Sequence, residues 1–302
     1  MSQENTLITI VGATAIGKTA LSIKLAQHFN CDIISCDSRQ FYKEMAIGTA
    51  VPDTNELAAA PHHFIQNRSI FEDYSVGQFE KDALAKLEEL FTKNPIQIMV
   101  GGSGLYVDAV LKGLDDFPDV DSQIRIDLTS ELENKGIEHL QQQLKELDEE
   151  TYNTIAIDNP HRLIRALEIC IGTGKTYASF KNKPKMPRNF QSIKIGLKAD
   201  REIMYDRINR RVDIMIENGL IEEAQQLHQY KELNALQTVG YRELFEYFDR
   251  SFTKEFAIEE IKKNSRRFAK RQGTWFRKDS EIIWFDFQED VKNIITTIEN
   301  KL

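Results

Sequence analysis

The chain has 302 residues, 41% of them hydrophobic, which is ordinary for a globular protein with one large domain or two smaller ones. Its three cysteines are too few and too irregularly spaced for a disulfide framework or a zinc site, no apolar run is long enough to span a membrane, and the polar start is no signal peptide, so we expect a cytoplasmic protein. The formal net charge of −8 argues against nonspecific coating of nucleic acid but leaves a local basic patch open.

A glycine-rich loop follows the first predicted strand. Residues 6–11 are β-branched and apolar, as in a buried parallel strand, and an amphipathic helix follows the loop. The loop has the pattern G-x-x-x-x-G-K-T and consists of Gly12, Ala13, Thr14, Ala15, Ile16, Gly17, Lys18 and Thr19. In this pattern backbone N–H groups surround an anion at the positive end of the helix, the lysine adds a charge, and the threonine hydroxyl can ligate Mg²⁺. The sequence therefore predicts a site for a ligand with at least two linked phosphates.

Strands and helices alternate through the rest of the first hundred residues. We predict a second strand at 31–35 and a third at 96–100, which runs into the glycine-rich loop 101–104. Between them, a helix is predicted from Ser75 to about Thr92, with a capping box formed by Ser75 and Gln78. The alternation is typical of a doubly wound α/β fold, in which helices flank a parallel sheet.

Two neighbouring histidines, His62 and His63, follow Pro61. No cysteine and no second histidine pair stands at ligand spacing from them. We therefore interpret them as packed or hydrogen-bonded residues and not as metal ligands.

The pattern changes near residue 115, where a charged helical stretch without strand candidates begins. The predicted helices span 124–132, 137–147 and 160–170. We predict an all-helical insertion domain at 115–189, set within an α/β core formed by 1–114 and 190–302. The sheet resumes in that second part of the core. Its predicted strands are 192–197 and 282–285.

Three loops follow strands of the predicted sheet: the phosphate loop, 37–40 and 101–103. Ligands of open α/β sheets bind beyond the carboxyl ends of the strands, so we expect these loops to lie side by side. Asp37 comes directly after a predicted strand, and its carboxylate would point toward the bound phosphates as a magnesium ligand or a general base. A turn or helix-cap aspartate is the alternative for such a residue.

Two basic segments follow later in the chain. Arg207 and Arg211 lie four residues apart and share one helix face, either as a clamp on phosphate or as a solvated basic face. Residues 262–278 are densely basic, lack acidic residues and contain interleaved aromatic residues. Contact with a phosphodiester backbone explains that pattern, and helix-surface charge with Phe268 and Trp275 in the core is the alternative.

These motifs together resemble the tRNA dimethylallyltransferase family over nearly the whole chain. The signposts are the phosphate loop, Asp37–Tyr42 with Ile47–Ala50, Pro61–Phe64, Gly101–Tyr106, Asn159–Glu168, Thr173–Lys175, Thr238–Glu243 and Ser265–Gln272. Ala13 and Ile16 stand where the family usually has proline and a small serine-like residue, and we expect these changes to tune affinity without abolishing it. The chain lacks the zinc-finger extension of eukaryotic relatives, which points to a bacterial-type enzyme.

The resemblance implies transfer of a dimethylallyl group from dimethylallyl diphosphate to N6 of the adenosine 3′ of the anticodon, in tRNAs that read codons beginning with U. The phosphate loop would hold the donor diphosphate, Lys18 would stabilise the leaving charge, and Thr19 would hold Mg²⁺. Asp37 would accept a proton from the weakly nucleophilic adenine amine. Arg207 and Arg211 would clamp the diphosphate.

The resemblance also implies residues that contact the tRNA, which would extrude its target base. Ser38, Arg39 and Gln40 would line the extruded base and its neighbours, with Ser103 across the cleft. In the insertion, the residues expected to grip the anticodon loop are Arg125, His161, Arg162, Leu163, Ile164 and Arg165. We expect a monomer, because no long apolar seam is left over.

Three other functions stay open at this stage. A small-molecule kinase would use ATP, but strand 96–100 runs into glycines where such an enzyme usually has an acidic magnesium residue. An adenine-nucleotide prenyltransferase would share the core chemistry but would not need the helical insertion or the basic segment. A non-enzymatic, nucleotide-dependent RNA-binding switch would leave Asp37 without a role.

Overall fold

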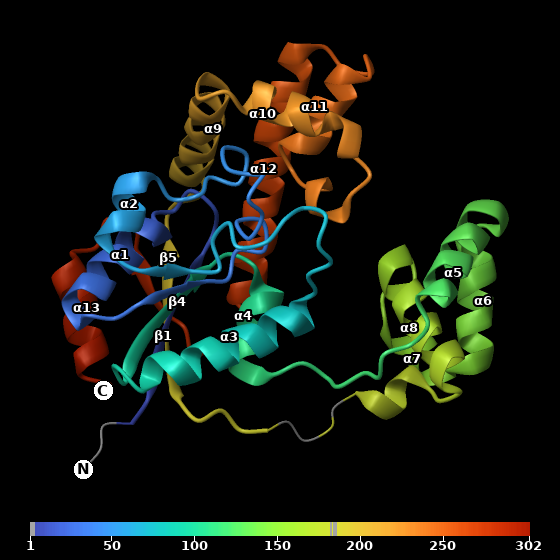
Figure 1. Cartoon of the computed structure of the whole chain (residues 1–302), viewed down its shortest axis with the longest axis horizontal. Helices are drawn as coiled ribbons and strands as arrows, with labels where there is room; N and C mark the ends of the chain where they lie inside the picture. Colours follow the sequence, from blue (N-terminus) through green and yellow to red (C-terminus); the bar gives the residue numbers. More distant parts are fainter. Residues whose placement is uncertain (1–3, 182, 184–185) are drawn as a thin grey trace. The chain divides into compact units, whose positions relative to one another are not determined.

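The protein is described by a computed structural model that covers residues 4–181, 183 and 186–302 (Figure 1). It divides into two compact units. The first comprises Met1–Lys112 and Arg188–Leu302, and the second, an insertion between them, comprises Gly113–Pro187. The insertion therefore begins at residue 113 and ends at 187, each two residues before the boundary predicted from the sequence.

A six-stranded parallel sheet forms the centre of the first unit. Its strand order is β3-β2-β4-β1-β5-β6. The strands are β1 (Thr6–Gly12), β2 (Ile33–Ser35), β3 (His62–His63), β4 (Ile96–Gly101), β5 (Gln191–Lys198) and β6 (Ile283–Asp286). The five predicted strands and the α/β fold class are confirmed. The sixth, β3, has only two residues, too few to show any periodicity in the sequence.

Helices cover both faces of the sheet because side chains alternate along its strands. In β1, Ile8 and Ile10 belong to one apolar cluster, and Leu7 and Val11 belong to the other. The first cluster packs against α1 (Lys18–Phe29) and α13 (Val291–Glu299), near α2 (Thr54–Ala59). The second packs against α3 (Val76–Phe91), α4 (Gly104–Lys112) and the end of α12 (Lys254–Phe276). The Ser75 hydroxyl caps α3 by accepting from the Gln78 N–H, while the Gln78 amide donates to Asp82, so half of the predicted capping box forms.

The remaining helices of this unit form a third cluster with the loop that follows β2 (Figure 1). They are α9 (Arg201–Glu217), α10 (Leu220–Leu227), α11 (Tyr241–Phe248) and the first part of α12, with 3₁₀ turns at His228–Tyr230 and Asn234–Leu236. Tyr241 is fully buried among them, beside Met45 of the loop. The cluster therefore fixes a loop at the carboxyl end of the sheet.

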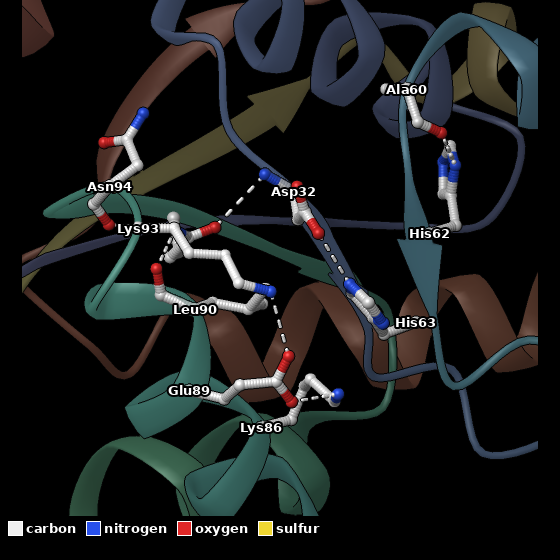
Figure 2. A network of polar contacts seen from close by, with 10 residues as sticks. Asp32, Ala60, His62, His63, Lys86, Glu89, Leu90, Lys93 and Asn94 are labelled. Carbon is white, nitrogen blue, oxygen red and sulfur yellow. Dashed lines mark hydrogen bonds and ion pairs between the residues drawn. The ribbon is translucent and has the colours of Figure 1, made fainter.

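The edge strand β3 is held by a polar network (Figure 2). His63 Nε2 lies 2.8 Å from a carboxylate oxygen of Asp32, and His62 Nδ1 lies 2.8 Å from the Ala60 carbonyl oxygen. The Asp32 N–H donates to the side chain of Gln97. Both histidines are thus hydrogen-bonded, as the sequence predicted.

The second unit is helical. Its elements are α5 (Ser122–Lys135), α6 (Ile137–Leu147), α7 (Glu149–Thr154), α8 (Pro160–Thr173) and a 3₁₀ turn at Tyr177–Phe180, and its described residues contain no strand. The core contains fully buried leucines from α6 and α8, among them Leu140, Leu144 and Leu167. The three predicted helices are confirmed, and α7 is an addition because six polar residues carry no apolar stripe.

Candidate active site at the carboxyl ends of the strands

A cavity of about 520 Å³ lies where β1, β2 and β4 end. Its walls come from segments far apart in the sequence, all of them in the first unit. They include Thr14 and Ala15 of the phosphate loop, Asp37–Arg39, Gly48 and Thr49, Gly102–Tyr106, residues of α9, residues 237–239 and 242, and one face of α12. The three strand-end loops therefore lie together, as predicted.

The phosphate loop has the tight backbone that its glycines predict. Gly12 and Gly17 have φ values of 147° and 108°, in the left-handed half of conformational space. A Cβ on Gly12 would lie 2.9 Å from the Leu197 carbonyl oxygen, so the adjacent strand also requires glycine there. Ala13 and Ile16, the two departures from the family pattern, are 4% and 1% exposed. Their side chains pack into apolar clusters and do not line the cavity.

Lys18 is enclosed by the phosphate loop. Its Nζ donates a 2.7 Å hydrogen bond to the Ala13 carbonyl oxygen. Burial lowers the pKa of Lys18 to about 8, with the charge of Asp37 opposing the shift and that of Arg211 adding to it. A buried ammonium that bonds only to a carbonyl oxygen keeps its positive charge available to an anion.

Two of the arginines of α9, Arg207 and Arg211, contact the phosphate loop. Arg207 Nε donates to the Ala15 carbonyl oxygen at 2.8 Å, and its guanidinium lies 4.9 Å from the centre of the Phe287 ring. Arg211 Nη1 lies 3.5 Å from the Thr14 hydroxyl and lines the cavity. Burial lowers the pKa of Arg211, although Asp37 opposes the shift, and the group stays charged. The shared helix face predicted from the sequence therefore points to the loop, and the alternative of a solvated basic face is wrong.

Asp37 combines a turn with a place in the cavity wall. β2 ends at Ser35 and the buried Cys36 follows, so Asp37 is the second residue beyond the strand and not the first, as predicted. Its carboxylate accepts a hydrogen bond from the Arg39 N–H at 3.2 Å, which is the turn role considered as the alternative. It also lines the cavity that Thr14 and Arg211 share. The turn fixes the carboxylate beside the cationic groups.

The neighbours of Asp37 differ in what their side chains do. The hydroxyls of Ser38 and Ser103 lie 3.4 Å apart across the cavity wall. Arg39 lines the cavity, and its guanidinium donates hydrogen bonds to the carbonyl oxygens of Asn234 and Ala235. Gln40 lies outside the cavity lining, because its amide donates to the carbonyls of the 49–50 loop. The side chain of Gln40 thus supports a loop next to the cavity, and its predicted contact with a bound base stays a prediction.

One carboxylate fixes the part of the cavity wall that Gly48 and Thr49 form. Glu223 of α10 accepts hydrogen bonds of 3.0, 2.8 and 2.9 Å from the successive N–H groups of residues 46–48. It also accepts a 2.6 Å hydrogen bond from the Tyr241 hydroxyl. A Cβ on Gly48 would lie 2.6 Å from the Tyr241 ring, so only glycine fits there. The wall formed by Gly48 and Thr49 is fixed by these contacts.

The basic segment 262–278 presents one helical face to the cavity. The residues on that face are Ser265, Phe268, Arg271, Gln272 and Trp275. Phe268 and Trp275 are 38% and 40% exposed, so the alternative that places them in the core is wrong. Some of the charge is used within the protein, since Lys262 pairs with Asp213 and Lys263 pairs with Glu260. The cavity face is therefore aromatic and polar, with Arg271 as its cation.

The helical unit changes the interpretation of four predicted RNA contacts. Leu163 and Ile164 are 0% and 5% exposed in its core, so their predicted role in gripping RNA is wrong. They lie on the apolar face of α8, which the helix must bury to fold. Arg125 and Arg165 both bond to the carboxylate of Glu168, at 2.6 and 3.0 Å.

Two of the predicted residues remain accessible in that unit. His161 and Arg162 are exposed in the first turn of α8. Arg162 has no ion-pair partner within the part of the chain that the structure describes. Arg165, on the same helix, is by contrast paired with Glu168. Burial alone would raise the pKa of Glu168, but the hydrogen bonds from Arg125 and Arg165 outweigh that effect and hold the pKa below its ordinary value. Of the two arginines of α8, Arg162 is therefore the one whose charge is not paired with a described residue.

Two residues that line the cavity and one that supports its wall were not predicted from the sequence. Gln272 and Arg242 belong to motifs that carried the family resemblance, but no chemistry distinguished them there. Glu223 belonged to no motif, and its role depends on Tyr241 and the 46–48 loop, which are distant in sequence. Only the fold brings such residues together.

The oxygen atoms of this site suit a metal ion that enters already bound to the phosphates of a ligand. No group of three or more His, Cys, Asp or Glu side chains that could hold a metal ion occurs among the described residues. The phosphate loop offers the Thr19 hydroxyl, and the cavity offers the Asp37 carboxylate. Hard oxygen donors of this kind suit Mg²⁺ that is bound mainly by phosphates and water. None of the described helices is long and apolar enough to cross a membrane.

Comparisons with known proteins agree with this geometry. Residues 40–279 match the family described as IPP transferase. The chain is 62% identical over 304 residues to tRNA dimethylallyltransferase of Flavobacterium psychrophilum, with 99% of each chain covered. It is 64% identical over 298 residues to that of Christiangramia forsetii, again with 99% of each covered.

Solved structures are similar as well. A tRNA isopentenylpyrophosphate transferase from Bacillus halodurans has a TM-score of 0.72 at 37% identity, covering 98% of this chain and 95% of that one. A eukaryotic dimethylallyltransferase acting on tRNA has a TM-score of 0.79 at 27% identity, covering 94% of this chain and 74% of that one. Because the family model matches residues 40–279, more than half of the chain, and relatives are more than 60% identical over nearly its whole length, the chain belongs to the IPP transferase family.

Proposed function

We propose that this chain transfers a dimethylallyl group from dimethylallyl diphosphate to N6 of the adenosine 3′ of the anticodon, in tRNAs that read codons beginning with U. One observation carries the proposal: a single cavity joins the phosphate loop, Asp37 and the aromatic face of α12. A donor that ends in phosphates and an acceptor with a π-face would meet there. The names of the similar proteins support the same reaction.

At the donor end, the loop and α9 supply cationic groups for the diphosphate. Lys18 would release the Ala13 carbonyl oxygen and bind a phosphate oxygen, while Arg207 and Arg211 hold the loop and add charge. Mg²⁺ held by Thr19 would share the negative charge that develops as diphosphate leaves. Because the leaving group departs as an anion, these charges act most strongly in the transition state.

At the acceptor end, Asp37 would act as general base. The N6 lone pair forms a bond to C1 of the prenyl group, and the C1–O bond breaks with its electrons going to the diphosphate. The proton lost from N6 passes to the Asp37 carboxylate. To reach this position the adenine must leave the anticodon stack, and Phe268 and Trp275 would offer it stacking surfaces.

The helical unit would contact the anticodon stem-loop through the exposed Arg162 and His161. These contacts would anchor the RNA while the target base enters the cavity of the first unit. The expected monomeric state and cytoplasmic location stay predictions.

The proposal is tested by transfer of radiolabelled dimethylallyl from its diphosphate to an unmodified anticodon stem-loop, with and without Mg²⁺. Free AMP and ATP-dependent phosphorylation of small molecules serve as parallel controls. We expect Mg²⁺-dependent label on RNA alone. Label on AMP alone would indicate an adenine-nucleotide prenyltransferase, and consumption of ATP without prenyl transfer would indicate a kinase.

A further inference from the structure

One N–H group of the phosphate loop is already occupied by the protein itself. The Thr14 N–H donates a 2.9 Å hydrogen bond to Oε1 of Gln272, a residue 258 positions later in the chain. The other end of the same amide donates to the Gly102 carbonyl oxygen at 3.0 Å. Gln272 thus bridges the loops that follow β1 and β4.

The bridge is tightly built. Gln272 is 6% exposed, and a Cβ on Gly102 would lie 2.2 Å from its Nε2. A buried amide with both ends bonded does not rotate away without leaving a donor and an acceptor unsatisfied. The same amide nevertheless lines the ligand cavity. It is therefore a fixed part of the wall next to Thr14.

The position of this bridge bears on how many phosphates the loop can hold. α1 begins at Lys18 and Thr19. In a loop of this pattern the helix N-terminus would bind one phosphate through backbone N–H groups, and a longer phosphate chain would need further N–H groups from the loop ahead of it. Thr14 lies in that part of the loop. Its N–H is bonded to Gln272, its hydroxyl faces Arg211, and Arg207 bonds the next carbonyl. Protein groups thus close that end of the loop.

We infer that Gln272 is a specificity-determining residue that limits the phosphate loop to a diphosphate and excludes a triphosphate. This inference rests on the proposed function, in which the diphosphate of the prenyl donor occupies the loop. It explains how a loop pattern shared with nucleoside-triphosphate enzymes serves a different head group: the N–H that a third phosphate would need is already paired.

The test measures the affinities of inorganic diphosphate and of tripolyphosphate, each with Mg²⁺, for the full chain by calorimetry. The wild-type chain should favour diphosphate. Gln272→Ala removes the acceptor of the Thr14 N–H and empties the volume that the amide occupies beside it. We therefore expect the preference for diphosphate over tripolyphosphate to fall about tenfold or more, which is the effect of one hydrogen bond to a charged group. Gln272→Glu keeps a carboxylate oxygen for the Thr14 N–H, so it should keep the preference while weakening both anions.

Glu255→Ala, on the exposed first turn of the same helix, is the matched control and should change neither affinity. Thermal melting verifies that each variant folds, and Gln272→Ser replaces the alanine variant if that one does not. Equal loss of both anions in Gln272→Ala, with the preference unchanged, would overturn the inference, because Gln272 would then only hold the loop in place. Absence of a preference in the wild-type chain would overturn it as well.

A separate assay tests the proposed function independently of the role of Gln272. The wild-type chain is assayed for prenyl transfer from dimethylallyl diphosphate to the stem-loop. A chain that discriminates between the two anions through Gln272 but transfers no prenyl group would contradict the reaction and not the role of Gln272.

Discussion

The ligand cavity and the helical unit both contain basic residues predicted to bind phosphate, but the two regions treat those charges differently. Beside the cavity, Lys18 of the phosphate loop bonds to a carbonyl oxygen and Arg211 of the cavity wall faces a hydroxyl, and neither has a carboxylate ion-pair partner among the described residues. In the helical unit, Arg125 and Arg165 share the carboxylate of Glu168. The residue types are the same, and the difference lies in what each cation is bonded to.

The comparison teaches that a basic motif identifies cations without showing whether their charge is free. A cation bonded only to neutral oxygens meets an incoming anion with its full charge, whereas one bonded to a carboxylate must first give up that partner. Burial strengthens the attraction between a cation and an anion, because less water screens their charges. The Lys18 pKa of about 8 reflects this cost of burying a charge, which the nearby charge of Asp37 only partly offsets. Variants in the two regions can test the contrast.

The largest effect is expected for Asp37, the one acidic side chain among the described residues that line the cavity. Asp37→Asn keeps the shape of the turn but removes the base, so the single-turnover rate of prenyl transfer should fall by about 10²–10⁴-fold, the range typical of general-base catalysis. tRNA affinity should stay within about twofold. Asp73→Asn, at an exposed position, is the control. A near-normal rate in Asp37→Asn would remove Asp37 from the role of base.

The same substitution in both regions tests the contrast directly. Arg211→Met should weaken diphosphate binding about 10- to 100-fold, because it removes a charged donor from the cavity. Arg125→Met should change tRNA affinity less than about threefold, because Glu168 already neutralises that arginine. Calorimetry and filter binding measure the two affinities. Equal losses in the two regions would show that ion pairing inside the protein does not decide which cations bind ligand.

The pH dependence of diphosphate binding tests whether the charge of Lys18 contributes to the affinity. Its pKa in the free protein is lowered to about 8, so below pH 8 the ammonium is already charged and diphosphate affinity should be flat. Above pH 8 the free protein loses this charge and binding must take up a proton, so Kd should rise by up to about tenfold per pH unit. Lys18→Arg stays charged over this range and should give a flat profile. A flat wild-type profile to pH 9.5 would contradict the assignment.

Among the cations predicted to bind ligand directly, the smallest effect is expected for Arg162 of α8. Arg162→Ala removes an exposed cation that has no ion pair with any described residue, and it should weaken tRNA binding about three- to tenfold, with a reduced salt dependence. Donor affinity should not change. Arg165→Ala, one turn away and paired with Glu168, is the matched comparison and should have the weaker effect. A larger loss in Arg165→Ala would reverse the ranking that the ion pairs suggest.

The sequence predicted those parts of the molecule whose information is local. The phosphate loop is contiguous, its glycines set its backbone, and the adjoining strand and helix show their own periodicity. Gln272 could not be assigned in this way, since its role depends on Thr14 and Gly102, which only the folded chain brings close. The errors at Leu163 and Ile164 arose from treating a motif as one surface. The 3.6-residue period of α8 separates its buried side from its exposed side.

The sheet order also has a consequence for how the chain is made. β1 pairs with β4 on one side and β5 on the other, and its side-chain contact from Thr6 to Gln191 spans 185 positions. During synthesis the whole helical unit therefore leaves the ribosome before β5 does, and until then one edge of β1, a strand buried along its whole length in the folded protein, lacks its neighbour. A nascent chain that stalls at this stage carries an open β edge, the feature by which unfinished proteins aggregate. An insertion that can bury its own core early leaves that edge as the main surface to protect.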